Sequence, residues 1–339
     1  MASLSDRCTG HGDIRGSQLQ ITAIYEPIQE DMVSVEERIR SLKRSAPPQM
    51  ADMVEYALQD PGKLLRPAIT LLAGKSFRYD QQLMVTMAVA VELLHIATLI
   101  HDDTVDKAQV RRGRPTLSST WGQGTAVLVG DYLFAFSADL VASTDEIRVA
   151  RNFAKTVMAI SSAELEANYT SFDWRQTRER YYQRIGNKTA SLFVLATQSG
   201  ATLCQAPEPV IEALKHYGYN LGLAFQIVDD VLDFIGEADE MGKPVGHDLS
   251  QGTLTLPAIL FLERQPKNNP IKRLFANHGD PDSLHQALET IGNSSIIQEC
   301  YDIALDFCSK ARQCLEVLQP SASQRSLDGL TDYVLQRKK

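Results

Sequence analysis

Apolar side chains recur three and four residues apart along almost the whole chain, and this spacing limits what the chain can fold into. Val33, Ile39 and Leu42 fall on one such stripe, and a second stripe runs from Met84 to Thr98. A repeat of three and four residues places side chains on one face of an α-helix. Strand-like alternation over more than four residues is hard to find. Prolines and glycines separate the periodic segments, so the sequence predicts an all-α protein.

The periodic segments continue to the end of the chain without a linker rich in glycine, serine or proline. We therefore predict one helical domain over residues 17–339. Residues 1–16 are polar and rich in glycine, so we expect a disordered tail and no signal peptide. The apolar stretch from Leu83 to Ile100 is long enough to span a bilayer, but Glu92 and His95 within it favour a core helix over a transmembrane segment.

Composition narrows the classes of function. The chain has 339 residues, with 34 Lys and Arg against 42 Asp and Glu, so its net charge is −8 and we expect no nucleic-acid partner. Its five cysteines form no C-x-x-C pair. This pattern favours reduced thiols and a cytoplasmic protein over a disulfide scaffold.

Two apolar segments end in the same acidic pattern, D-D-x-x-D. Residues four apart share a helix face, so Asp102 and Asp106 should point together, and so should Asp229 and Asp233. Like charges at this spacing repel by roughly 0.2–0.5 kcal/mol. A single pattern of this kind is often a solvated helix end, but two copies indicate a hard divalent cation, for which Mg²⁺ suits best. The six aspartates are Asp102, Asp103, Asp106, Asp229, Asp230 and Asp233.

Cationic residues gather near the acidic segments. Arginine suits bidentate capture of phosphate oxygens, and lysine acts as a point charge. Carboxylates for Mg²⁺ beside such cations predict a diphosphate substrate. His95 shares a helix face with Asp102, and is a candidate substrate contact. Gln226, three residues before Asp229, is another. The cations are Lys63, Arg66, Arg111 and Arg112, together with Lys188 and Lys243, which lie just before helical segments.

The chain carries seven short motifs that, taken together and in their order along the sequence, resemble those of the trans-isoprenyl diphosphate synthases. The resemblance covers about residues 20–335. The resemblance implies an isoprenoid synthase-type helical bundle around a central cavity, a homodimer, and elongation of an allylic diphosphate with isopentenyl diphosphate. The motifs are Gly62-Lys63-x-x-Arg66-Pro67, Glu92-Leu93-Leu94-His95, His101-Asp102-Asp103-x-x-Asp106, Arg111-Arg112-Gly113, Gly130-Asp131-Tyr132-Leu133, Lys188-Thr189-Ala190 and Phe225-Gln226-x-x-Asp229-Asp230-x-x-Asp233.

The resemblance also implies a role for each residue that matches a motif. Two positions depart from the family pattern: Leu64 stands where members often have arginine, and Thr253 where many have a second lysine. These departures predict weaker phosphate binding without loss of activity. The implied ligands of Mg²⁺, at two or three ions per active site, are Asp102, Asp106, Asp229 and Asp233, with Asp103 assisting and Asp248 as a further supporting aspartate of the second site. Asp230 is implied to take part in catalysis. The implied contacts of isopentenyl diphosphate are Lys63, Arg66, His95 and Arg112. The implied contacts of the allylic diphosphate are Arg111, Lys188, Thr189, Gln226 and Lys243, and the arginine and the two lysines among them join the aspartates in catalysis.

Two small residues bear on product length. Thr98 lies one helical turn before Asp102 on the same face, beside Ala97, so a growing isoprenoid tail must pass both. In short-chain members of the resembled family, an aromatic residue at either position closes the pocket. We therefore predict a long-chain polyprenyl product of the kind used for quinone side chains, with a deeper floor at Phe134 and Phe136. Ala97 could instead serve only helix packing, and farnesyl or geranylgeranyl diphosphate is the alternative product.

Other classes fit the residues less well. A cyclising terpene synthase normally lacks the second D-D-x-x-D and the Gly-Lys-x-x-Arg segment. A metal-dependent phosphohydrolase could use His101 and His247, yet the seven histidines show no H-x-x-H spacing. A non-catalytic subunit of a heteromeric synthase typically lacks the aspartates. A P-loop is excluded, because Ile69 stands where the motif ending in Gly74-Lys75-Ser76 requires its first glycine.

Overall fold

Helices account for nearly all of the regular structure in the computed structural model, which describes residues 21–60, 62–236, 245–277 and 280–337. The expected tail, residues 1–16, lies outside the described residues. The elements are η1 (Glu26–Ile28), α2 (Gln29–Ser41), η2 (Leu42–Ser45), α3 (Ala51–Leu58), α4 (Leu65–Gly74), α5 (Gln81–Val105), β1 (Val110–Arg111), β2 (Arg114–Pro115), α6 (Leu117–Trp121), α7 (Gln123–Ala142), α8 (Ile147–Tyr169), α9 (Arg178–Ile185), η3 (Gly186–Ala190), α10 (Ser191–Leu203), α11 (Glu208–Ile235), α13 (His247–Ser250), α14 (Leu256–Arg264), α15 (Pro270–Ala276), α16 (Pro281–Gly292), α17 (Ile296–Cys314), η4 (Leu315–Val317) and α18 (Ala322–Leu335).

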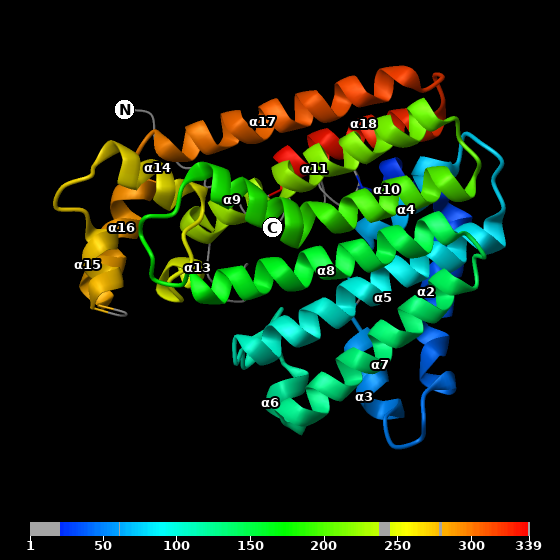
Figure 1. The fold of residues 1–339 in the computed structure, drawn as a ribbon, viewed down its shortest axis with the longest axis horizontal. Helices are drawn as coiled ribbons and strands as arrows, with labels where there is room; N and C mark the ends of the chain where they lie inside the picture. Colours follow the sequence, from blue (N-terminus) through cyan, green and yellow to red (C-terminus); the bar gives the residue numbers. More distant parts are fainter. Residues whose placement is uncertain (1–20, 61, 237–244, 278–279, 338–339) are drawn as a thin grey trace, which may run out of the picture.

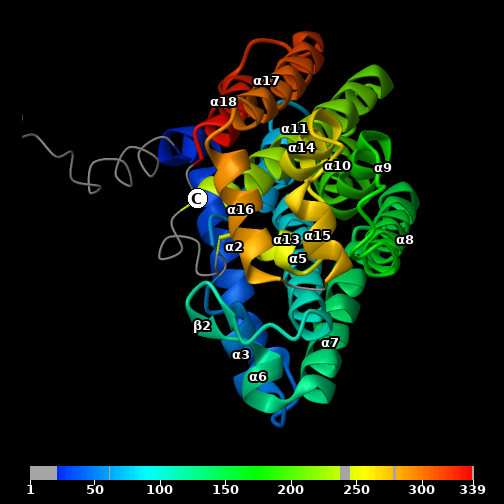
Figure 2. The same cartoon turned by 90° about the vertical axis from the view of Figure 1, so that its left-hand side faces the viewer.

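Helix α5 forms the centre of the bundle. It packs against α2, α4, α7 and α10, and α11 packs between α10 and α17 (Figure 1). In the view turned by 90°, α2 lies on one side of α5 and α8 on the other (Figure 2). Met84, Met87, Val91 and Leu94, on the apolar stripe of the sequence, are all buried in the core. The periodicity therefore predicted the helix, but not how completely it is buried, because every residue from Met84 to Leu94 is buried.

Prolines mark helix starts where the sequence suggests a break. Pro207 immediately precedes α11, and Pro281 is the first residue of α16. Proline is tolerated there because the first backbone N–H groups of a helix have no partner within it. Within the bundle, α4 and α10 pack closely at Gly200. A Cβ atom on Gly200 would lie 2.2 Å from the carbonyl oxygen of Thr70, so this approach requires glycine.

Helices α5 and α7 are long and apolar enough to cross a membrane by length and composition alone. Core helices of soluble proteins pass the same test, and most of the apolar window of α5 is buried within the bundle. Less than half of the α7 window is buried. Part of the apolar surface of α7 is therefore left without cover in the isolated chain, including Val127 and Leu128.

A two-stranded hairpin follows α5, and the sequence analysis did not anticipate it. Strands β1 and β2 pair antiparallel, with Arg111 opposite Arg114. The two residues between them, Arg112 and Gly113, have φ angles of 51° and 73°. Left-handed conformations at both central positions are typical of the two-residue turns that connect hairpins. The hairpin places two predicted phosphate-binding arginines directly after the first acidic segment.

Candidate active site

The first acidic cluster lies at the C-terminal end of α5. The backbone N–H of Asp106, the residue that ends the helix, donates to the carbonyl oxygen of Asp102 at 2.8 Å. Helical geometry is therefore kept up to the position that brings these two carboxylates to one face. Asp103 accepts a hydrogen bond from Nε of Arg111 at 2.7 Å. Arg111 thus ties the hairpin to the acidic cluster.

Asp102 lies in an environment that disfavours its charged form. Burial, together with smaller effects of the nearby carboxylates of Glu164 and Asp106, raises the pKa of Asp102 to about 7. Lys188 and Arg111 act in the opposite direction, because a positive charge stabilises the carboxylate. Four carboxylates meet here, those of Asp102, Asp103, Asp106 and Glu164, against the two cations Lys188 and Arg111. Such a donor set fits an additional cation.

Lys188 and Thr189 lie on a π-helical turn, η3, that joins α9 to α10. They directly precede α10, as expected, and the turn also continues α9, so the helical run is unbroken. Insertions of this kind widen a helix locally and are frequent at functional sites. Nζ of Lys188 lies 2.5 Å from Oε1 of Glu164 on α8. Burial by itself would lower the pKa of Lys188, but the carboxylates of Asp102 and Glu164 raise it overall.

The second acidic cluster lies at the C-terminal end of α11 and its members differ in exposure. Asp229 is exposed, and its carboxylate lies 3.6 Å from the guanidinium of Arg337 near the C-terminus. Asp233 is 1% exposed and accepts a hydrogen bond from the backbone N–H of Asp248 at 3.2 Å. Asp233 therefore helps to hold the segment that carries Asp248. Lys243 lies outside the described residues.

Asp230 belongs to a buried hydrogen-bond network. Its two oxygens accept from the hydroxyl of Tyr181 and from Nε2 of Gln226, each at 2.7 Å. Oε1 of Gln226 in turn accepts from the hydroxyl of Thr189 at 2.6 Å. Burial raises the pKa of Asp230, while the two hydrogen bonds oppose this because they stabilise the carboxylate. The network joins two predicted allylic contacts to the second cluster.

The predicted isopentenyl diphosphate contacts surround a buried carboxylate, Glu92. Burial raises the pKa of Glu92 to about 7, although Arg66 and Arg112 act to lower it. Burial lowers the pKa of Arg66 to about 10, and its guanidinium lies 5.0 Å from the ring centre of Phe193. Burial and the nearby arginines hold the pKa of His95 well below its usual value. His95 is therefore neutral at pH 7 and can both donate and accept a hydrogen bond.

Lys63 and Arg112 lie at the edge of this group. Nη1 of Arg112 donates to the carbonyl oxygen of Asp60 at 3.2 Å. Nζ of Lys63 lies 5.4 Å from the ring centre of Tyr333 on α18. Between Lys63 and α4, Leu64 adopts a left-handed conformation with φ of 50°. The segment before α4 therefore turns sharply where the sequence departs from the family pattern.

The residues predicted to control product length lie on α5 and α7. Ala97 is buried, and the hydroxyl of Thr98 donates to the carbonyl oxygen of His95 at 2.7 Å. Phe134 stacks on Phe153 of α8, with ring centres 6.0 Å apart. Phe136 contacts Tyr132 instead, at 6.2 Å. Tyr132 donates to the carbonyl oxygen of Ser45, so Phe134 and Phe136 face different sides of α7.

The register of α7 against α5 gives the depth of these aromatic residues. Gly130 lies against the ring of His101, where a Cβ atom would come within 2.3 Å of Nε2. Ser137 donates to the carbonyl oxygen of Ala90 at 2.7 Å. The helices are therefore antiparallel, and Phe134 lies beside the α5 segment near Ala97. Phe134 therefore lies at nearly the same depth along α5 as Ala97 and Thr98, and not at a deeper level.

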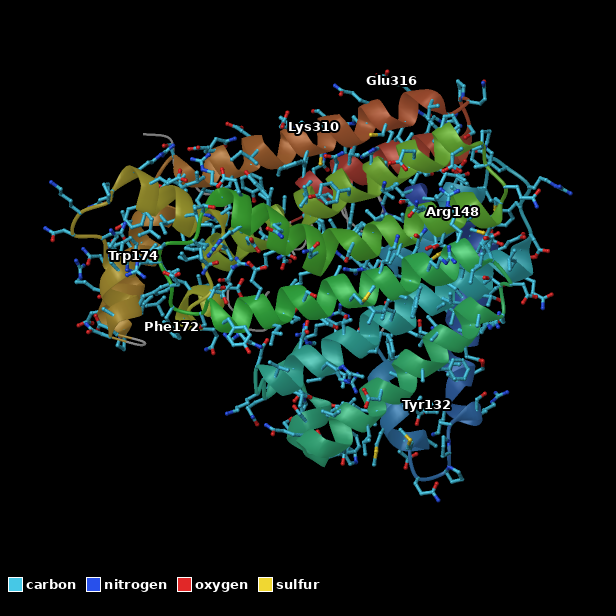
Figure 3. The ribbon with its side chains drawn as sticks, viewed as in Figure 1. Tyr132, Arg148, Phe172, Trp174, Lys310 and Glu316 are labelled. Atoms are coloured by element: carbon cyan, nitrogen blue, oxygen red, sulfur yellow. The ribbon has the colours of Figure 1, made fainter. Side chains whose placement is uncertain are left out.

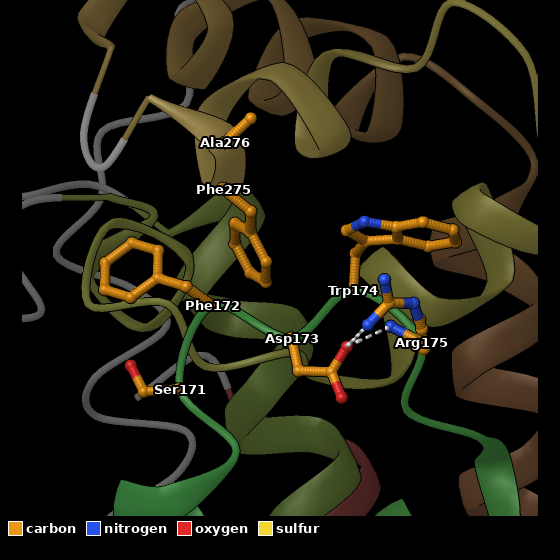
Figure 4. Close-up of a pocket in the computed structure, with 7 residues that line it drawn as sticks. All are labelled: Ser171, Phe172, Asp173, Trp174, Arg175, Phe275 and Ala276. Carbon is orange, nitrogen blue, oxygen red and sulfur yellow. Dashed lines mark hydrogen bonds and ion pairs between the residues drawn. The ribbon is translucent and has the colours of Figure 1, made fainter.

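A surface pocket of about 270 Å³ lies elsewhere, between the α8–α9 loop and α15. Phe172 and Trp174 mark this end of the molecule, far from Arg148 at the opposite end (Figure 3). The rings of Phe172 and Phe275 meet edge to face at 5.4 Å. None of the predicted site residues lines the pocket (Figure 4). Its lining consists of Ser171, Phe172, Asp173, Trp174, Arg175, Phe275 and Ala276.

Sequence reasoning missed three residues that the structure brings to the site. Glu164 lies in an ordinary amphipathic helix, and nothing in its spacing distinguishes it from Glu166. Tyr181 is one of two adjacent tyrosines. Arg337 is separated from Asp229 by more than one hundred residues, and its guanidinium lies 3.8 Å from the ring centre of Phe225. Only the packing of distant helices reveals these contacts.

In the described part of the chain, the protein side chains do not by themselves enclose a metal ion. Within the described residues, no three His, Cys, Asp or Glu side chains converge on one point that could hold a metal ion. A cage made wholly of protein ligands is therefore not present there. Mg²⁺ is usually held by one or two carboxylates and completed by water and substrate phosphates. Carboxylates at the ends of α5 and α11 fit this open form of coordination.

An all-α bundle with two acidic clusters and interleaved arginines and lysines defines a class of enzyme that acts on diphosphates with divalent metal ions. The polyprenyl synthetase family model matches residues 47–291, and the chain belongs to this family. It is a trans-prenyltransferase that makes a polyprenyl diphosphate. The family uses divalent metal ions.

Relatives and solved structures agree on the family. A prenyl transferase of Synechocystis is 36% identical, over 94% of this chain and 99% of its own. Heptaprenyl diphosphate synthase component 2 of Geobacillus stearothermophilus is 34% identical, over 94% and 99%. A polyprenyl synthase of Caulobacter crescentus, solved with calcium and isoprenyl diphosphate, matches with a TM-score of 0.89 at 31% identity, over 94% and 98%. A decaprenyl diphosphate synthase of Rhodobacter capsulatus matches with a TM-score of 0.86 at 34% identity, over 94% of this chain and 99% of its own.

Proposed function

We propose that the chain condenses isopentenyl diphosphate with an allylic diphosphate in successive head-to-tail additions and releases a long-chain all-trans product. The observation that carries this proposal is the position of Lys188, whose ammonium interacts with Asp102 of the first cluster while Thr189 beside it bonds to Gln226 near the second. The turn η3 thus connects the two acidic clusters. Similarity to proteins titled heptaprenyl and decaprenyl diphosphate synthases supports the long product.

The allylic diphosphate would lie between the two clusters. Asp102, Asp106, Asp229 and Asp233 would hold two or three Mg²⁺ ions, which when bound neutralise the charge on the departing diphosphate. Arg111 and Lys188 would add fixed positive charge on the same side and stabilise the charge that develops as the allylic C–O bond breaks. Lys243 is proposed for the same role on the basis of its motif alone.

Isopentenyl diphosphate would be held by the cations that surround Glu92. Arg66 and Arg112 would bind its phosphate oxygens, and neutral His95 would add a hydrogen bond without further charge. Held there, its double bond attacks the allylic cation and forms the new C–C bond. The proton lost from the product passes to the released diphosphate, so no side-chain base is required. Buried apolar walls keep out water, which would quench the cation.

The growing tail would pass Ala97 and Thr98 toward the N-terminal half of α5. Helices α7 and α10 each pack against both α5 and α8, while α5 and α8 are not a closely packed pair. We place the central cavity of the family between these four helices. Phe134, stacked on Phe153, would then form a side wall of the cavity, and Phe136 would stabilise α7 from its other side.

The same chain is proposed to form a homodimer through α7 and α8. Large apolar side chains are exposed on both helices, among them Leu128 at 65% and Met158 at 61%. We also propose that residues 17–339 form one domain. We further propose that the protein is cytoplasmic and contacts a membrane peripherally. Leu128→Asp with Met158→Asp should shift the sedimentation of the purified protein from dimer to monomer, whereas Leu305→Asp on α17 should not. A wild-type monomer at micromolar concentration would contradict the dimer.

The deciding experiment is a product assay. Purified protein is incubated with isopentenyl diphosphate, Mg²⁺ and, in separate reactions, dimethylallyl, geranyl, farnesyl or geranylgeranyl diphosphate. The products are then sized by mass. We expect chains longer than geranylgeranyl. Products that stop at farnesyl or geranylgeranyl diphosphate would contradict the long-chain proposal. Activity that requires an added second protein would place the chain with relatives that are titled as one component.

A further inference from the structure

Tyr181 is fully buried and yet uses its hydroxyl group. The residue lies on α9 with 0% of its surface exposed, and its hydroxyl donates to Oδ2 of Asp230. The other oxygen of Asp230 accepts from Nε2 of Gln226. Asp230 is itself 2% exposed. Its carboxylate is therefore fixed at both oxygens, from α9 on one side and from within α11 on the other.

The fixed carboxylate sets the orientation of the next two side chains. Both oxygens of Asp230 accept hydrogen bonds in this structure, so Gln226 turns its NH₂ group toward Asp230. The carbonyl oxygen of Gln226 is then directed to Thr189, whose hydroxyl must donate. Each hydrogen-bonding group from Tyr181 to Thr189 is therefore held in a single orientation, either as a donor or as an acceptor. An amide or hydroxyl without such partners rotates among several orientations.

We propose that Tyr181 is a positioning residue of the allylic site: through Asp230 it holds Gln226 and Thr189 in one orientation toward the substrate. This inference rests on the proposed allylic role of Gln226 and Thr189. Tyr181 is too deeply buried to touch the substrate, so it acts only through the side chains it orders. The Tyr181 hydroxyl fixes Gln226 and Thr189 before the substrate binds. These side chains then lose less conformational entropy on binding, which strengthens the binding of the substrate.

The neighbouring residue, Tyr182, provides a matched control. Its ring contacts Tyr181 and Phe307 at 5.4 and 5.7 Å. Among the described residues, the Tyr182 hydroxyl makes no hydrogen bond like the one that Tyr181 donates to Asp230. Tyr181→Phe and Tyr182→Phe therefore remove the same atom from the same helix, and only the first breaks the path to Thr189.

The test is steady-state kinetics with farnesyl diphosphate and isopentenyl diphosphate. Loss of one hydrogen bond in a buried path should raise the KM for farnesyl diphosphate about tenfold in Tyr181→Phe. The KM for isopentenyl diphosphate should stay within about twofold, because its proposed cations lie on α4 and the hairpin. Tyr182→Phe should match the wild type in both. Equal changes in both KM values would overturn the inference.

A double-mutant cycle separates positioning from general stability. If Tyr181 acts through Gln226, Tyr181→Phe should change the KM for farnesyl diphosphate less than about twofold in a Gln226→Ala background. A full tenfold effect in that background would overturn the inference. Gln226→Ala without effect on this KM would instead contradict the proposed allylic site. Should Tyr181→Phe fail to fold, Asp230→Ala removes both acceptors of the path, and a normal KM for farnesyl diphosphate in that variant overturns the inference.

Discussion

Lys188 and Glu164 form an ion pair of 2.5 Å between the π-helical turn and α8. The same ammonium interacts with Asp102 at the end of α5. One cation therefore lies between a carboxylate of the first acidic cluster and a carboxylate on a helix that carries no recognised motif. Glu164 therefore helps to hold the Lys188 ammonium beside Asp102.

Replacing Glu164 should weaken the allylic site. We expect Glu164→Gln to raise the KM for the allylic diphosphate about threefold to tenfold, because a partly exposed ion pair contributes on the order of 1 kcal/mol. Glu166→Gln, two residues further along α8, should leave this KM unchanged. The comparison is made by steady-state kinetics at saturating isopentenyl diphosphate. An unchanged KM in both variants would show that Lys188 does not need Glu164.

Removing one aspartate from either cluster should abolish turnover. Asp102→Ala and Asp229→Ala each delete a carboxylate proposed to hold metal, and losses of more than about a thousandfold in kcat are expected when such electrostatic stabilisation is lost. Circular dichroism should show unchanged helicity. Asp139→Ala, at an exposed position on α7, is the control. Rates close to wild type in either cluster variant would remove the two-cluster mechanism.

Glu92 should make stability fall as the pH rises. Its pKa is about 7 in the folded chain against an ordinary value of 4.5, so the folded state holds a proton that the unfolded state has released between these values. The contribution of Glu92 to stability is therefore greatest below pH 4.5 and declines until about pH 7. Glu92→Gln, which stays neutral, should unfold with a free energy higher by about 3 kcal/mol at pH 8 than wild type, and by much less near pH 5.

Thermal or urea unfolding of the substrate-free protein measures this difference. Glu289→Gln, at an exposed position on α16, should follow the wild-type pH profile. Equal stabilities of wild type and Glu92→Gln at both pH values would show that Glu92 is charged and fully compensated by Arg66 and Arg112.

A larger side chain beneath the first cluster should shorten the product. Ala97→Phe or Thr98→Phe would close the path along α5, because the added ring occupies space that the tail must cross. The first condensation should still proceed, since the diphosphate contacts are unchanged. Mass analysis should show products of farnesyl or geranylgeranyl length, while the exposed Ala142→Phe should keep the wild-type length. Unchanged length in both pocket variants would rule out this route for the tail.

Local spacing was enough to predict the helices and the two acidic clusters. Helical periodicity and repeated D-D-x-x-D depend on neighbours within four residues, and the geometry of a helix is the same in any context. Helix α5 and the pair of Asp102 and Asp106 follow from it directly. The order of the motifs then indicated the family and the classes of substrate.

Tertiary structure decided what the chain brings to those clusters from elsewhere. Glu164 reaches Lys188 from another helix, and Tyr181 reaches Asp230 across forty-nine positions in the sequence. The π-helical turn at Lys188 and the side of α7 that Phe134 faces also depend on packing. Such contacts are set by how helices cross and by which buried polar groups must find partners, and spacing along one helix contains neither.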